Sequence, residues 1–189
     1  MKTKKKALTL LPNDGSAPKI VSLFGILGAI ALVLSLFEEA LFPELPFLPA
    51  GAKIGLSNIV TMFAASFSGL FGALYITALK ALFAFITRGA VAGAMSLCGG
   101  VLSAFALCAA LKFKNKGFSF VGIGVICAVF HNLGQLFCAC VLSGAAMLGY
   151  GKYLLLFAII SGSLTGVVLN VVMPRLDTAG IRRRLSEKN

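Results

Sequence analysis

The sequence predicts an all-α, polytopic membrane protein with six transmembrane helices. Of its 189 residues, 59% are hydrophobic and 12% are charged, and the mean hydropathy is +0.98. Soluble domains carry about 25% charged residues, so this composition excludes a soluble globular enzyme, a disordered chain and a coiled coil. Apolar stretches long enough to cross a bilayer recur along the chain.

The apolar stretches lie between two basic tails, at residues 1–19 and 175–189, and define a transmembrane domain over residues 20–174. The first stretch, Ile20 to Phe37, has the length of one crossing. The stretch 54–87 is too long for a single crossing, so it predicts a tight hairpin broken at Ser68-Gly69, with a short first half that is tilted or partly re-entrant. The predicted spans are 20–37, 54–67, 70–87, 90–111, 118–142 and 153–173.

Charge predicts the orientation of these spans. Thirteen of the 17 Lys and Arg residues lie in the two tails and in one loop at residues 112–116. The positive-inside rule puts those segments in the cytoplasm and leaves only Lys53, Arg88 and Lys152 outside. We therefore expect a bacterial cytoplasmic membrane protein with both termini in the cytoplasm. The net charge of +11 is explained by this placement, and no nucleic-acid partner is expected.

The outer segment 42–51 contains three prolines and several apolar residues, so it cannot be regular helix throughout. It is either a rigid connector or a lid. The nearby acids, Glu38 and Glu39, are assigned to the same outer loop. No acid is predicted deep within a span.

Lys80 is the charged residue that falls within a predicted span. Ionisable groups inside a bilayer are costly and are candidates for function. Its partner must be Glu38, Glu39, a backbone carbonyl, water or an anionic ligand. Ligand contact and a structural role are both open for this side chain.

A second polar group is the segment His131-Asn132-Leu133-Gly134-Gln135 in the fifth predicted span. Residues three and four apart share a helix face, so its polar side chains line either a pocket or an interhelical contact. Asn58 lies near the outer end of the second span, and Arg88 lies at the outer boundary. The predicted substrate-binding set is Lys80, Asn58, His131, Asn132, Gln135 and Arg88.

The sequence predicts no catalytic group and no cofactor. It contains no phosphate-binding G-x-x-x-x-G-K-[ST] loop and no paired carboxylates for magnesium. The five cysteines all fall within apolar runs and are interpreted as packing residues, so no metal site is predicted. We therefore do not expect an enzyme.

Two segments carry a resemblance to a known family: residues 49–61, Pro-Ala-Gly-Ala-Lys-Ile-Gly-Leu-Ser-Asn-Ile-Val-Thr, and residues 131–135. Over about residues 20–175 the chain resembles the membrane proteins called heptaprenyl diphosphate synthase component I, or the Gx transporter family. That family is grouped with the substrate-binding S components of energy-coupling factor (ECF) transporters. The resemblance implies a six-helix S-component-like bundle, and Gly25-x-x-x-Ala29 resembles the patch by which S components meet their coupling subunit.

The favoured function is the S component of an ECF-type importer. Its partners would be a coupling transmembrane subunit and two ATPases. Its ligand would be a small anionic organic molecule, either vitamin- or flavin-like or an isoprenoid or quinone precursor. The alternative is a non-catalytic membrane partner of a heptaprenyl diphosphate synthase in isoprenoid-quinone synthesis. A stand-alone secondary carrier is disfavoured because it would need an ion-coupling site, and the spans lack carboxylates.

Overall fold

The computed structural model describes residues 17–41, 55–113 and 119–178. These ranges contain helices and short connections without any strand, which confirms the all-α class. The outer segment 42–51, for which a connector and a lid were both left open, and most of both basic tails lie outside the described residues. The elements are α1 (Ala17–Leu41), α2 (Asn58–Arg88), α3 (Ala90–Phe113), α4 (Phe120–Ser143), the 3-10 helix η2 (Ala145–Tyr150) and α5 (Gly151–Thr178).

The protein is a multi-pass membrane protein. Among the described residues, five segments are long and apolar enough to cross a bilayer: Val21–Leu41, Ser68–Arg88, Ala90–Ala110, Phe120–Ser143 and Ala145–Val172. Large apolar side chains point outward from them, among them Ile86 at 73% and Phe137 at 68% exposure. In water such exposure would be unfavourable, whereas in a bilayer these side chains face lipid.

The prediction of six spans is confirmed for five of them. The predicted second span, 54–67, corresponds to the first part of α2, which begins at Asn58 and reaches a break at Gly69. Residues 58–68, which we call the short arm, extend about 16 Å. This is about half of a ~30 Å hydrocarbon core, so the short arm does not cross the membrane as a full span.

The chain reverses direction at Gly69, whose φ of 59° and ψ of −143° are not helical. Asn58 and Lys80 would stand about 33 Å apart in a continuous helix, yet the Lys80 Nζ lies 2.7 Å from the Asn58 Oδ1. The short arm therefore folds back against residues 70–88, which we call the long arm. The arms pack closely, because a Cβ on Gly72 would lie 2.8 Å from the Ala64 carbonyl oxygen. The predicted break at Ser68-Gly69 is correct.

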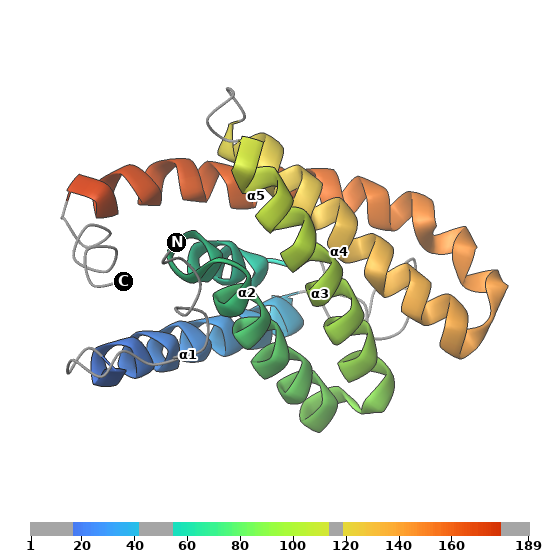
Figure 1. Cartoon of the computed structure of the whole chain (residues 1–189). Coiled ribbons are helices and arrows are strands. Elements are labelled where there is room, and N and C mark those ends of the chain that lie inside the picture. Colours follow the sequence, from blue (N-terminus) through green and yellow to red (C-terminus); the bar gives the residue numbers. More distant parts are fainter. Residues whose placement is uncertain (1–16, 42–54, 114–118, 179–189) are drawn as a thin grey trace, which may run out of the picture.

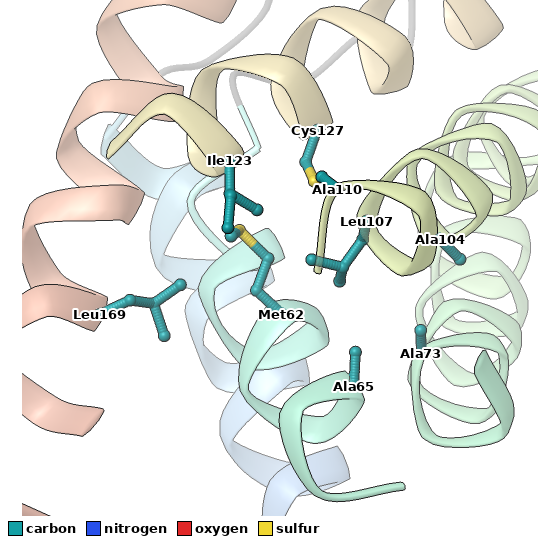
Figure 2. Packing of buried hydrophobic residues seen from close by; sticks show 9 residues of the cluster. All are labelled: Met62, Ala65, Ala73, Ala104, Leu107, Ala110, Ile123, Cys127 and Leu169. Atoms are coloured by element: carbon teal, nitrogen blue, oxygen red, sulfur yellow. The ribbon is translucent and has the colours of Figure 1, made fainter. Parts of the chain in front are cut away.

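The helices pack as a chain of neighbours: α1 on α2, α2 on α3, α3 on α4, and α4 on α5. α2 also contacts α5, so its short arm lies between α1 and α5 (Figure 1). The main apolar cluster joins both arms of α2 with α3, α4 and α5 (Figure 2). Its buried members are Met62, Ala65, Ala73, Ala104, Leu107, Ala110, Ile123, Cys127 and Leu169.

Glycines bring the backbones of α4 and α5 into contact. A Cβ on Gly124 would lie 2.3 Å from the Gly162 carbonyl oxygen, and one on Gly166 would lie 2.3 Å from the Val121 Cα. Gly162-x-x-x-Gly166 is thus a small-residue motif at a real helix contact, and the sequence analysis missed it. α1, by contrast, packs its own apolar cluster chiefly on α2.

Candidate ligand site

A small polar cavity opens where the end of α1 meets the start of the short arm. Helices α1 to α4 all contribute to its wall, and the cavity measures about 10 Å³, roughly the room for one water molecule. We call it the polar chamber. Its lining residues are Ser35, Gly55, Ser57, Lys80, Arg88, Ser96, His131 and Gln135.

Lys80 is held on the chamber wall by the start of the short arm. Its exposure is 7%, and its ammonium group donates a hydrogen bond of 2.7 Å to the Asn58 Oδ1. Gly55 fixes Asn58 in turn, because the Asn58 N–H donates to the Gly55 carbonyl at 2.9 Å. Only glycine suits this place: φ is +100°, and a Cβ would lie 2.7 Å from the Asn58 Nδ2.

His131 and Gln135 form the opposite wall, one turn apart on α4. Both are buried, and the His131 Nε2 lies 3.2 Å from the Gln135 Nε2. The Gln135 Oε1 has no hydrogen-bond partner among the described residues. The two ends of an amide are assigned from their surroundings. In either orientation, therefore, one polar atom of Gln135 remains available to a ligand or water.

Asn132 does not belong to this wall, although it is adjacent to His131 in the sequence. Its Nδ2 donates a hydrogen bond of 2.6 Å to the Leu154 carbonyl oxygen of α5. Its side chain also lines a separate crevice between α4 and α5. Neighbouring residues on a helix point about 100° apart. The structure thus separates Asn132 from the rest of the predicted binding set.

Glu38 is the functional candidate that the sequence analysis missed. The helix α1 continues to Leu41, so Glu38 lies in its last turn and is only 1% exposed. Its Oε1 accepts a hydrogen bond from the Gly55 N–H. Its Oε2 is buried without a hydrogen-bond partner among the described residues. The assignment of Glu38 to an outer loop was therefore wrong.

A helical pattern already present in the sequence leads to Glu38. Ser35 precedes it by three residues, and both side chains are buried on the face of α1 that carries Ala31. Ser35 lines the polar chamber, and so does Gly55, the partner of Glu38. The carboxylate therefore lies directly behind the chamber wall.

Arg88 lies at the rim of the chamber, as predicted from its position at the end of a span. Its Nε is 3.8 Å from the Glu39 Oε2, and the two side chains are 16% and 38% exposed. Partly exposed pairs of this kind contribute at most about 1 kcal/mol. The contact joins the ends of α1 and α2 only weakly, so an incoming anion can compete for the guanidinium group.

The chamber thus combines two cations, an imidazole and an amide with a buried carboxylate behind them. Lys80 and Arg88 suit an anionic group, and Gln135 provides directional hydrogen bonding. In the described ranges, no three His, Cys, Asp or Glu side chains gather in a way that could hold a metal ion. The arrangement is suited to binding a polar molecule.

A protein-family model described as heptaprenyl diphosphate synthase component I matches residues 27–172. The match covers more than half of the chain and includes every residue that lines the polar chamber. The chain belongs to this family. This match confirms the resemblance to heptaprenyl diphosphate synthase component I that was inferred from residues 49–61 and 131–135. Comparisons with curated proteins and with solved structures found no match.

Proposed function

We propose that this protein is a non-catalytic membrane component that binds a small organic molecule through an anionic group. The observation that carries the proposal is the convergence of Lys80, Arg88, His131 and Gln135 on one chamber. Charge-assisted hydrogen bonds are roughly twice as strong as neutral ones, so an anionic group would bind well beside the two cations of the chamber. Behind the wall, the free oxygen of Glu38 favours a ligand that also carries a hydrogen-bond donor.

The chamber has to widen to admit such a molecule. Pockets for small organic ligands measure about 300–1,000 Å³, whereas this cavity has room for about one water molecule. The Arg88–Glu39 contact is partly exposed and joins the ends of α1 and α2. We infer that the ligand enters by displacing this contact and moving the end of α1.

The family description supports one setting for this binding component. In that setting the chain is the membrane partner of a heptaprenyl diphosphate synthase and contributes no catalytic residue. Its chamber then takes the charged end of an isoprenoid or quinone precursor. We take this setting as the first candidate because the family match supports it.

The second candidate is the S component of an ECF-type importer, with a coupling membrane subunit and two ATPases as partners. One observation favours it: Gly25 and Ala29 lie exposed on α1, and a Cβ at Gly25 would meet nothing within 4 Å. This face can receive a second helix at short distance. In this candidate the ligand is vitamin- or flavin-like.

Affinity purification in a mild detergent, followed by mass spectrometry, separates the two candidates. A co-purifying prenyl synthase supports the first, and a membrane protein with two ATPases supports the second. Gly25→Leu with Ala29→Leu should abolish recovery of the partner if α1 is the docking face. Ala109→Leu, which also enlarges an exposed small residue, should not. Equal recovery with both variants would reject this surface.

Calorimetric titration tests the chamber itself. Farnesyl diphosphate and riboflavin 5′-phosphate serve as probes for the two ligand classes. Lys80→Met should weaken binding of the preferred probe about 10- to 100-fold, because hydrogen bonds to charged groups contribute about 1.5–3 kcal/mol. The control is Lys152→Met, which removes an exposed lysine. Unchanged affinity in Lys80→Met would remove Lys80 from the site, and binding of neither probe would refute both ligand classes.

A further inference from the structure

Four sulfur-bearing side chains meet where α3, α4 and η2 come together. Met95 and Cys98 extend from α3, Cys138 from α4 and Met147 from η2. Met95 and Cys138 are almost fully buried, at 1% and 6% exposure, and share one packed cluster. Cys98 and Met147 are partly buried and pack against it. Two of the chain's five cysteines and two of its five methionines thus lie in one place.

The helix geometry holds these side chains together. Met95 and Cys98 are three residues apart and lie on one face of α3. Cys98 of α3 packs against the cluster that contains Cys138 of α4. That contact is close, because a Cβ on Gly134 would lie 2.7 Å from the Cys98 carbonyl oxygen. The two cysteines therefore lie on neighbouring helices that pack closely at this cluster.

The side-chain donors within this apolar cluster are thiol and thioether sulfurs, which are soft. The remaining members of the described cluster are Ala94 and Ala139, which offer no side-chain oxygen or nitrogen. Thiolate and thioether ligands select Cu(I) over hard cations such as Mg²⁺ and Ca²⁺. We propose that Cys98 and Cys138 bind one Cu(I) ion as thiolates, with the thioethers of Met95 and Met147 completing the coordination.

Charge and protons balance without a redox step. Copper enters as Cu(I), the two thiols release two protons to solvent, and the metal stays in the same oxidation state. The release of protons makes binding tighter at higher pH. The ion can reach the site through η2, which has no buried residue among its six. This proposal gives Cys98 and Cys138 a role in addition to the packing role predicted from the sequence.

Cys108 and Cys127 supply a matched control. They too come from α3 and α4, one from each helix. Cys127, however, packs in the main apolar cluster with side chains such as Leu107 and Ile123. A general affinity of membrane thiols for copper would involve both pairs, whereas a built site involves only Cys98 and Cys138.

The test is a competition titration of the full chain in detergent against the Cu(I) chelator bicinchoninate under reducing conditions. We expect one Cu(I) per chain. Cys98→Ser with Cys138→Ser should weaken binding by more than the roughly 10- to 100-fold lost when an outer-shell partner is removed. Cys108→Ser with Cys127→Ser should keep the wild-type affinity. Circular dichroism establishes that each variant is folded.

Met95→Leu with Met147→Leu keeps both thiols and the apolar volume, so it tests the site even if the serine variants do not fold. It should weaken Cu(I) binding about 10-fold. The proposal is overturned if the wild-type protein does not compete with the chelator, or if the Cys108 and Cys127 variant loses copper as fully as the Cys98 and Cys138 variant. Unchanged affinity in the methionine variant would confine the site to the two thiols and refute the four-sulfur set.

Discussion

Replacing Gly69 by alanine tests the turn that brings the two arms of α2 together. The glycine has φ of 59° and ψ of −143°, a conformation that is essentially restricted to glycine and costs other residues of order 1–3 kcal/mol. A Cβ at this position would meet nothing within 4 Å, so no steric clash adds to this cost. We therefore expect Gly69→Ala to lower the free energy of unfolding by about 1–3 kcal/mol.

The control is Gly149→Ala in η2. A Cβ there also meets nothing within 4 Å, and the backbone is not in the left-handed region. This substitution should be neutral or stabilise the protein by about 0.4–1 kcal/mol, because alanine restricts the unfolded chain. The two variants therefore differ only in backbone strain at the substituted residue.

Titration of the purified protein with SDS in mixed micelles measures both variants. The chain has no tryptophan, so the loss of helix is followed by far-UV circular dichroism. Gly69→Ala should unfold at a lower SDS fraction than the wild type and should bind the preferred probe more weakly, because Asn58 reaches Lys80 only through this turn. If Gly69→Ala is as stable as Gly149→Ala, the reversal does not depend on glycine and the reasoning is refuted.

Four further substitutions at three positions test the chamber and the helix contacts. Glu38→Gln keeps an acceptor for the backbone N–H that the carboxylate binds, so the stability measured in the SDS titration should stay the same or rise. Glu38→Ala removes this acceptor and should lower the free energy of unfolding by about 1–3 kcal/mol. Equal losses in the two variants would show that the negative charge is needed. Asn132→Leu removes the hydrogen bond to Leu154 and should lower the free energy of unfolding by about 0.6 kcal/mol. If calorimetry shows that this variant also binds the probe more weakly, Asn132 contributes to ligand binding and its separation from the chamber is wrong. Gly124→Ala would put a Cβ 2.3 Å from the Gly162 oxygen and should cost about 1–3 kcal/mol; a neutral result in the same titration would contradict the α4–α5 contact.

Much of the fold follows from hydropathy and length. The break at Ser68-Gly69 was predictable because a mainly apolar stretch of 34 residues exceeds one crossing. The position of the short arm in the bundle was not predictable from the sequence, because it depends on the tertiary contact between Gly55 and Glu38. Composition also does not reveal which small residues meet: Gly162 and Gly166 touch α4, whereas Gly25 faces outward.

The candidate site was predicted in part. The four-residue spacing on α4 places His131 and Gln135 on one wall. A charged residue within an apolar run pointed to Lys80. Helix rotation explains the failure for Asn132, whose neighbour in space is α5. Glu38 was missed because it follows the apolar run next to Glu39, and a hydropathy profile does not tell which of two adjacent acids turns inward.

The burial of the short arm has an electrostatic consequence for the chamber. A helix carries about half a positive charge at its N-terminus, and this helix begins at Asn58, next to the chamber residues Gly55 and Ser57 and only 8% exposed. Its partial charge therefore adds to that of Lys80 in a region that water and ions reach poorly. Dissolved salt screens buried charges far less than exposed ones. The Glu38 carboxylate behind the wall offsets part of this charge. If an anion binds in this chamber as proposed, its affinity should change little with the ionic strength outside the membrane.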